Sequence, residues 1–273
     1  MPELPEVEVV CRGLAPLLRG RKISSVTHNS LQLRHPFPDE AEVATILNST
    51  IVKIYRRAKY IIIGFGNRTC LVIHLGMTGR LGVFQAAEPR LKHDHIRFRL
   101  DGGRVLRLND SRRFGSVRIL DSEDDLEKLL NYPGPDPFSD SFNTKYLLEK
   151  STGKRRPVKN FLMDARVVAG IGNIYASELL HRAAINPHSE IRLLKKEQWG
   201  KIIAATREIL HAAIDSGGTT ISDYADSEGR SGYFQIHLRV YGKETDLCPA
   251  CNSKIVKTVL AGRATFHCPK CQK

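Results

Sequence analysis

The sequence predicts an α+β fold, in which a leading α-helix and a β-sandwich precede a helical domain that ends in a β-hairpin. Three observations support this prediction. Short β-branched and apolar runs dominate residues 51–120, helical patterns follow a proline-rich segment near residue 132, and two CxxC pairs flank a strand–turn–strand pattern at the carboxyl end. The expected divisions are a sandwich domain over 1–131, a linker over 132–142, a helical domain over 143–238 and a hairpin over 239–273.

The first element is an amphipathic helix that begins just after the start of the chain. Val7, Val10 and Leu14 follow the i, i+3, i+7 spacing of a buried stripe. Pro5 suits a first helical turn, and nearby acidic residues suit the positive end of the helix dipole. Pro16 is expected to kink or interrupt this helix, because its ring clashes with a carbonyl one turn earlier.

Pro2 is a candidate nucleophile. A Met before a small residue is normally trimmed, which would leave the secondary amine of Pro2 at the amino terminus. An α-amino group titrates near ~8 and a lysine near ~10.4, so this amine has far more of its neutral form at neutral pH. Its attack on an aldehyde-like carbon gives an iminium, an electron sink for covalent catalysis. Glu3 and Glu6 lie close enough to move protons. Alternatively, Pro2 only resists trimming, and Pro5 and Glu6 only open the helix.

The rest of the first domain consists of short strands with turns between them, which is typical of an antiparallel β-sandwich. Asp101, Gly102 and Gly103 form a turn between two of these strands. The predicted strands are residues 51–55, 60–65, 71–73, 95–100, 105–108 and 116–120.

Two basic side chains of this domain are candidates for contact with a substrate. Lys59 precedes an apolar strand, where it could be desolvated and act as an acid or base, or could extend its ammonium to solvent. The segment 92–95 contains two histidines, but no third metal ligand is evident beside them. Contact of His93 with a phosphate is the favoured interpretation.

Met77, Arg112 and Phe114 lie in glycine-bounded or charged turns. An apolar wedge and an arginine on loops can fill a gap left in a base stack. Taken one at a time, each of these residues is better explained by ordinary packing.

The second domain begins after a stiff connector with three prolines in residues 133–137. Gly172 precedes a helix that begins near Asn173, and free N–H groups at a helix start favour a phosphate. Lys154 and Lys159 would add positive charge, although such glycines often only punctuate helices. The predicted helices are residues 144–150, 158–164, 173–183 and 195–216.

Two CxxC pairs separated by sixteen residues match the ligand pattern of a structural zinc site. Two disulfides are the alternative, which a reducing compartment disfavours. Between the pairs, Arg263 lies at the tip of a predicted hairpin, well placed to contact phosphates. The isolated Cys11 and Cys70 are expected to be small buried residues. The predicted ligands are Cys248, Cys251, Cys268 and Cys271.

The composition favours a polyanionic partner. The formal net charge of this 273-residue chain is +13, which indicates nucleic acid or simply a basic solvated surface. No apolar run reaches the roughly 20 residues of a membrane span. The amino-terminal segment is acidic and has no apolar signal region, so a cytoplasmic location is expected.

Together these segments resemble bacterial formamidopyrimidine-DNA glycosylase, from Pro2 to Lys273, in order and at family-like spacings. The strings that carry the resemblance are Pro-Glu-Leu-Pro-Glu-Val-Glu, Arg-Arg-Ala-Lys-Tyr, His-Leu-Gly-Met-Thr-Gly, Lys-His-Asp-His, Asn-Asp-Ser-Arg-Arg-Phe-Gly, Gly-Ile-Gly-Asn-Ile-Tyr-Ala-Ser-Glu and the terminal cysteine hairpin.

The resemblance implies a helix–two-turn–helix motif, a zinc finger holding one structural Zn²⁺, and action on damaged double-stranded DNA. It implies excision of oxidised purines such as 8-oxoguanine and formamidopyrimidines, followed by β,δ-elimination at the abasic site. This chemistry needs no small-molecule cofactor, no membrane partner is expected, and a monomer is the default expectation. Residues 217–234 align with the family's loop over the flipped base.

The resemblance also implies residue roles. Pro2 matches the nucleophile, Glu3 the proton donor and Glu6 a supporting carboxylate. Lys59 matches the basic residue linked to β-elimination and Arg263 the arginine linked to δ-elimination. The matched DNA-contacting positions are His93, Arg112, Lys154, Lys159 and Asn173, and the matched gap-filling positions are Met77, Arg112 and Phe114.

Two alternatives stay open. Endonuclease VIII, a relative that prefers oxidised pyrimidines, usually begins Pro-Glu-Gly-Pro-Glu, so Leu4 favours the purine branch. A catalytically silent binder of damaged DNA would use the same groove, but would not need Pro2, Glu3, Lys59 and Arg263 together.

Overall fold

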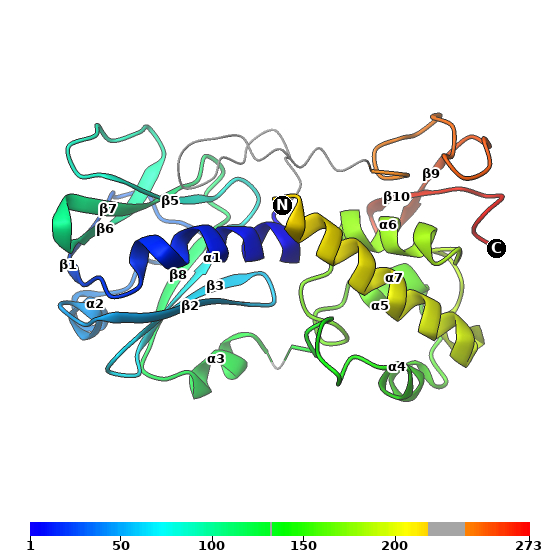
Figure 1. The fold of residues 1–273 in the computed structure, drawn as a ribbon, viewed down its shortest axis with the longest axis horizontal. Helices are drawn as coiled ribbons and strands as arrows, with labels where there is room; N and C mark the ends of the chain where they lie inside the picture. Colours follow the sequence, from blue (N-terminus) through cyan, green and yellow to red (C-terminus); the bar gives the residue numbers. More distant parts are fainter. Residues whose placement is uncertain (132, 218–237) are drawn as a thin grey trace. The chain divides into compact units, whose positions relative to one another are not determined.

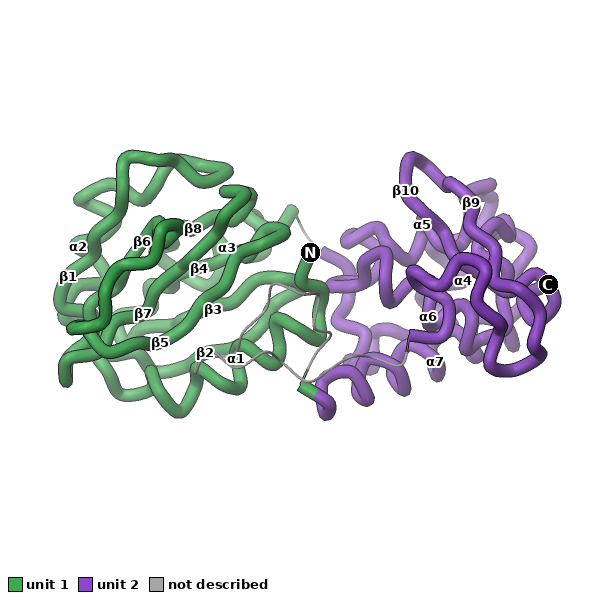
Figure 2. Tube along the Cα trace, turned by 90° about the horizontal axis from the view of Figure 1, so that it is seen from above, with its two compact units in different colours: residues 1–132, 217–234 green, residues 133–216, 235–273 purple. Residues whose placement is uncertain are grey.

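The computed structural model describes residues 1–131, 133–217 and 238–273. These residues form two compact units (Figure 2): unit 1 contains residues 1–131 and 217, and unit 2 contains residues 133–216 and 238–273. The finer division into linker, helical domain and hairpin stays a prediction. Within the described ranges, no helix combines the length and apolarity that crossing a membrane requires.

Unit 1 contains two four-stranded antiparallel sheets, which confirms the predicted sandwich (Figure 1). In spatial order, the first sheet is β1 (Ile23–His28), β6 (Asp94–Leu100), β7 (Arg104–Asn109) and β5 (Arg80–Gln85). The second is β2 (Ile51–Arg57), β3 (Tyr60–Phe65), β4 (Cys70–His74) and β8 (Ser116–Leu120). A 3₁₀ turn, η1 (Asp101–Gly103), joins β6 to β7 at the predicted position.

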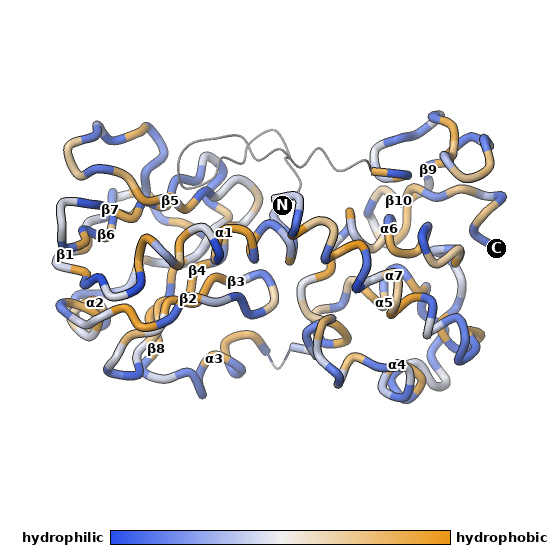
Figure 3. The backbone as a smooth tube through the Cα atoms, viewed as in Figure 1, coloured by the Kyte–Doolittle hydropathy of each residue, from blue (hydrophilic) through white to orange (hydrophobic). Residues whose placement is uncertain are grey.

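The core of unit 1 lies between these sheets and the helix α1 (Leu4–Leu18), which contacts β2, β3 and β5. Alternate residues such as Ile96 and Phe98 point inward from β6, as the period of two requires. Figure 3 shows the apolar stretches along α1 and the neighbouring strands. The predicted interruption at Pro16 is wrong: α1 continues to Leu18, because Pro16 lies in the last turn and removes only one intrahelical donor.

Unit 1 also contains four elements that the sequence patterns did not predict: β1, β5, and the short helices α2 (Glu40–Ile46) and α3 (Asp124–Leu129). α3 lies on the outer face of the second sheet, where Leu126 packs with Ile62 and Val72. Helices this short are stable only when packed, so local periodicity is a weak signal for them.

Unit 2 is helical and ends in a β-hairpin, as predicted. Its elements are α4 (Thr144–Ser151), α5 (Val158–Leu162), α6 (Asn173–Arg182), a 3₁₀ turn η2 (Ile191–Leu193), α7 (Lys196–Asp215), β9 (Val256–Leu260) and β10 (Arg263–His267). Trp199 of α7 is fully buried and its ring lies 5.7 Å from that of Phe161 in α5. The predicted loop over the base, at residues 217–234, lies outside the described residues apart from Gly217.

Candidate active site

The start of α1 is a closed network of acidic groups. The backbone N–H of Glu3 donates to the Glu6 carboxylate at 2.8 Å, and the Glu3 side chain accepts from the N–H of Glu6 in return. This reciprocal capping box satisfies two donors that a helix start otherwise leaves unpaired. Both acids are nearly inaccessible, at 2% and 3% exposure. The same contacts that cap the helix therefore hold Glu3 in one position beside the amino terminus.

The amino terminus lies close enough to the other predicted catalytic groups of unit 1 for their charges to shift its pKa. Burial lowers the pKa of the Met1 α-amino group below its usual value of 8.0. Lys59 and Arg112 lower this pKa further, whereas Glu3 and Glu6 raise it. The fold thus brings together residues separated by more than one hundred positions, around an amine whose neutral form is favoured.

Lys59 lies in the tight turn between β2 and β3, where Arg57 pairs with Tyr60. The neighbouring Ala58 has a φ of 53°, the left-handed conformation that such a turn requires. The charge of Lys59 also affects the pKa of His74, which lies at the end of β4. Burial, and then Lys59, lower the pKa of His74 to about 4, so this ring is neutral near pH 7. Its Nδ1 accepts the N–H of Gly76 at 3.0 Å.

Met77, Arg112 and Phe114 are presented on two adjacent loops of unit 1. Met77 is 41% exposed and Phe114 45% exposed, so both large apolar side chains are accessible to a partner. The Arg112 guanidinium lies 4.8 Å from the centroid of the Phe114 ring. An exposed arginine–aromatic pair beside an exposed methionine is chemically suited to contact bases.

His93 lies directly before β6, half-buried, and its carbonyl accepts the N–H of Asp110. The neighbouring His95 is buried, and its two ring nitrogens contact Asn29 and the carbonyl of Asp110. In the parts of the chain that the structure describes, these histidines belong to no group of three or more potential metal ligands. The phosphate contact of His93 stays a prediction.

Unit 2 holds the remaining candidates, and Arg263 is the most exposed of those near the hairpin tip. The turn between β9 and β10 contains only Ala261 and Gly262, both with positive φ, and Arg263 pairs with Leu260. A two-residue turn of this kind matches the twist of the strands and makes a rigid tip. Lys154 is also exposed and follows α4, where its N–H donates to Ser151.

Lys159 and Asn173 meet the hairpin backbone next to Arg263. The Lys159 ammonium donates to the Ala264 carbonyl at 3.0 Å and to the Thr265 hydroxyl at 2.8 Å. The Asn173 side-chain amide donates to the same carbonyl at 3.1 Å. Lys159 is only 1% exposed. Its phosphate contact stays a prediction, while its observed bonds join α5 to β10.

A hollow of about 290 Å³ lies between α5 and the hairpin tip. It is lined by Arg156, Lys159, Asn160, Met163, Leu260, Ala261 and Arg263. Its three cationic residues and one amide suit an anionic group such as a phosphate.

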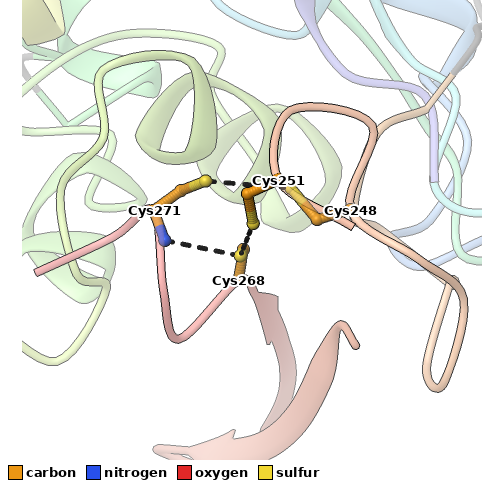
Figure 4. A group of neighbouring side chains, drawn as sticks. All are labelled: Cys248, Cys251, Cys268 and Cys271. Atoms are coloured by element: carbon orange, nitrogen blue, oxygen red, sulfur yellow. Dashed lines mark hydrogen bonds between the residues drawn. The ribbon is translucent and has the colours of Figure 1, made fainter. Parts of the chain in front are cut away.

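The four cysteines of the CxxC pairs converge at the base of the hairpin (Figure 4). Their sulfurs all lie within 4.8 Å of one another, with Cys251 and Cys268 at 3.4 Å and Cys248 and Cys271 at 3.9 Å. These separations exceed a disulfide bond of about 2.05 Å. They suit four sulfurs placed about 2.3 Å from one tetrahedral Zn²⁺. The cluster can therefore hold a metal ion.

The ionisation of these thiols fits a cation at their centre. Hydrogen bonds from Ser253 lower the pKa of Cys251 to about 6. The pKa of Cys271 is raised to about 12, first through its contact with Cys251. One thiolate forms easily and the next is disfavoured by the first, a penalty that a bound divalent ion removes.

Two residues of α6, Glu178 and His181, contact the chain near the cysteine cluster. The sequence patterns did not identify either of them. Glu178 is 3% exposed, and its carboxylate accepts the N–H groups of Arg239, Val240 and Tyr241 at 2.8–3.0 Å. Nε2 of His181 lies 3.4 Å from the Cys248 sulfur. Their i, i+3 spacing on α6 is a signal that one helix face serves both contacts.

Two family profiles match the chain. The formamidopyrimidine-DNA glycosylase N-terminal domain matches residues 1–117, and the formamidopyrimidine-DNA glycosylase H2TH domain matches residues 133–225. Among curated proteins, the chain is 42% identical to a formamidopyrimidine-DNA glycosylase of Idiomarina loihiensis and 43% identical to one of Ruthia magnifica. Both matches cover all of this chain and all of the relative.

Solved structures are similar over almost the same length. The Lactococcus lactis protein in complex with DNA that contains an abasic site is 34% identical, with a TM-score of 0.90 and 99% of each chain covered. Its complex with DNA that contains Fapy-dG has the same identity and score, with 99% of this chain and 100% of that chain covered. The Thermus thermophilus protein is 37% identical, with a TM-score of 0.88, and 99% and 98% of the two chains are covered.

Proposed function

The chain belongs to the formamidopyrimidine-DNA glycosylase family, and on that basis we propose a residue-level route for its reaction. The protein is a glycosylase of base excision repair that acts on damaged DNA. The proposed substrates are 8-oxoguanine and formamidopyrimidines in duplex DNA. The observation that carries the route is the convergence of the amino terminus with Glu3, Glu6 and Lys59 in unit 1.

Pro2 is the proposed nucleophile, after removal of Met1. The surroundings that lower the pKa of the present α-amino group would act on the Pro2 amine in the same way. Its nitrogen lone pair attacks C1′ of the damaged nucleoside, the bond from C1′ to the base breaks, and the base leaves with that electron pair. The Pro2 nitrogen then loses its proton, its lone pair forms the second bond to C1′, and the bond from C1′ to O4′ breaks as O4′ takes up a proton. This ring opening gives an iminium between Pro2 and C1′.

Glu3 is the proposed proton donor for this first step. The departing base and the opening sugar both gain negative charge, which a proton from a positioned carboxylic acid neutralises. Glu6 supports this role of Glu3, because its carboxylate accepts the backbone N–H of Glu3. This arrangement makes Glu6 a positioning group whose charge also acts on the amine.

The same iminium explains strand cleavage. Loss of a proton from C2′ places electrons in conjugation with the iminium, and the C3′–O bond breaks with the phosphate as leaving group. Lys59 is the proposed acid or base in this β-elimination, and Arg263 is proposed to hold the phosphate that leaves in the δ-elimination. An arginine can bind two phosphate oxygens at once.

The proposed duplex contacts fall into two kinds. Met77, Arg112 and Phe114 would fill the gap that the extruded nucleotide leaves, which offsets the few kcal/mol that unstacking costs. The proposed backbone contacts are His93, Arg112, Lys154, Lys159 and Asn173. Exposure of Lys154 and of the Arg112–Phe114 pair supports this assignment.

The four cysteines are proposed to hold one Zn²⁺, which has a structural role and leaves the chemistry to the protein's own groups. A monomer in the bacterial cytoplasm is the proposed working form. Light scattering of the purified protein tests the oligomeric state, and metal analysis tests the ratio of one zinc per chain.

Trapping with sodium borohydride tests the nucleophile directly. The protein is incubated with an 8-oxoguanine:cytosine duplex and the reductant, and the cross-linked peptide is located by mass spectrometry. We expect a reduced adduct on Pro2 that lacks Met1. A Lys59→Met variant should still form this adduct, whereas a protein with an uncleavable amino-terminal extension should not.

Other outcomes overturn specific parts of the proposal. An adduct on a lysine removes Pro2 from its role, and binding without adduct or cleavage favours the silent binder. Faster cleavage of a thymine glycol duplex than of the 8-oxoguanine duplex favours the endonuclease VIII alternative.

A further inference from the structure

Two loops of unit 1 carry the proposed gap-filling side chains. Close backbone contacts and hydrogen bonds lock these two loops together. The β4–β5 loop, residues 75–79, carries Met77, and the β7–β8 loop, residues 110–115, carries Arg112 and Phe114. β5 and β7 are neighbours in one sheet, and β4 and β8 are neighbours in the other. The two loops therefore run side by side between the same two sheets.

The backbones of the two loops touch directly. Gly76 has a φ of +63°, and a Cβ added to it would lie 2.5 Å from the nitrogen of Gly115. A Cβ on Gly115 would lie 2.9 Å from the carbonyl oxygen of His74. Neither position has room for a side chain, so each loop forms a wall of the other.

A single hydroxyl spans this contact. The Thr78 Oγ1 donates to the Asp110 carboxylate and accepts the backbone N–H of Arg112 at 3.1 Å. Thr78 follows Met77 directly, and Arg112 is two residues from Phe114. The hydroxyl thus joins the residue after Met77 to the backbone of Arg112.

Asp110 completes the lock from inside the protein. Its side chain is fully buried, and its second carboxylate oxygen accepts the N–H of Gly115 at 2.8 Å. Its carbonyl accepts Nε2 of the buried His95 at 2.8 Å. A buried carboxylate with these partners is costly to move, because each lost bond leaves a desolvated group.

We propose that Thr78 is a positioning residue that couples the two loops, so that Met77, Arg112 and Phe114 enter the base stack as one rigid group. This inference rests on the proposed gap-filling function of those three residues. A gap in a stack has a fixed height, and independent loops would lose conformational freedom on entering it, whereas a locked pair has little left to lose. The hydroxyl sets the spacing of the three side chains without touching DNA itself.

The main test compares Thr78→Val with Thr78→Ser. Valine keeps the shape of threonine and removes the hydroxyl, whereas serine keeps the hydroxyl. We expect Thr78→Val to lower single-turnover excision of 8-oxoguanine from a duplex by about ten- to a hundredfold, the range that a displacement near 1 Å produces. Thr78→Ser should restore excision to within about threefold of the parent protein. Thr45→Val is the matched control, since its hydroxyl bonds only within α2.

A second readout separates this inference from the proposed chemistry. A single-stranded oligonucleotide with an abasic site has no opposite strand and no stacked gap to fill. Borohydride trapping on this substrate should be unchanged by Thr78→Val. Loss of trapping in the parent protein would contradict the Pro2 route, whereas its loss only in a folded Thr78→Val variant would contradict the coupling role.

A double-mutant cycle identifies the side chains through which Thr78 acts. In a Phe114→Ala background, Thr78→Val should cost less than about threefold further, because the group it positions is already incomplete. Costs that multiply independently would overturn the proposal. So would a Thr78→Val protein that melts like the parent and excises 8-oxoguanine at the parental rate.

Discussion

The amino-terminal site of unit 1 and the cysteine hairpin of unit 2 are held in place by different means. Glu3 and Glu6 lie at the start of a helix whose apolar face packs into the large core between two sheets. The hairpin has a core of only five buried residues: Val240, Cys248, Ile255, Phe266 and Cys268. Two of these five are proposed metal ligands. A core this small does not support itself without further constraints.

The hairpin obtains those constraints from its cysteines and from the helices of unit 2. Lys159 and Asn173 hold Ala264, and Glu178 holds the backbone at residues 239–241. Packing of α1 against a large core and the capping box at its start therefore position the acidic groups, whereas the cysteine cluster and a few buried polar bonds position Arg263. Each of the following perturbations should therefore affect the two regions unequally.

Removal of the metal should have the largest effect. Structural zinc contributes about 10–16 kcal/mol of binding free energy in small zinc modules, so chelation should unfold the hairpin. Hydrogen exchange should rise in residues 240–273 and stay unchanged in residues 51–120. Cys251→Ala should reproduce the effect, and Cys11→Ala, outside the cluster, should not. Equal protection of the hairpin with and without metal would contradict the comparison.

Glu3→Gln should have the next largest effect, confined to unit 1 and to one step. Losing the proton donor should lower 8-oxoguanine excision by about 10²- to 10⁴-fold. Cleavage at a pre-formed abasic site should fall much less, because no base remains to be expelled. Gel assays on the two duplexes measure both rates. An equal loss on both substrates would indicate that Glu3 acts on the amine instead.

Acid should destabilise unit 1 through His74. Its pKa is about 4 in the folded protein and near 6.5 when unfolded, so the unfolded state binds the proton first as pH falls. The stability from neutral His74 is full above pH 6.5 and is lost progressively down to pH 4, about 3 kcal/mol in all. Denaturant unfolding of His74→Asn should lack this part of the pH dependence. If the free energy of unfolding of His74→Asn changed with pH in parallel with that of the parent protein, His74 would not be the source of this acid sensitivity.

Lys159→Met should have the smallest effect, confined to the hairpin. It leaves the Thr265 hydroxyl without this donor and the Ala264 carbonyl with Asn173 alone. A lost buried bond of this kind costs about 1–3 kcal/mol. Hydrogen exchange should rise in β9 and β10 but not in α1, and zinc content should stay the same. Lys154→Met, at an exposed position, is the control.

Strongly patterned elements were predictable from the sequence. β6, β8 and α7 match their predicted ranges within two residues, because their apolar residues repeat with the period of the element. β3 also matches, because Ile61, Ile62 and Ile63 form a continuous β-branched run. β1 and β5 were missed. β1 is buried mainly at Ile23, and β5 has Gly82 in its interior, so neither alternates clearly. Their pairing with β6 and β7 supplies the missing stability.

The sequence by itself determined the features whose chemistry is local. The CxxC spacing identified the cysteine cluster, and Pro2, Glu3 and Glu6 are close in the chain whatever the fold. The tertiary structure alone decided which distant groups meet: Thr78 with Asp110, and Lys159 with Ala264, are 32 and 105 residues apart. The physical reason is that a hydrogen bond needs its two atoms within about 3 Å, and only packing of the whole core brings remote backbone segments that close.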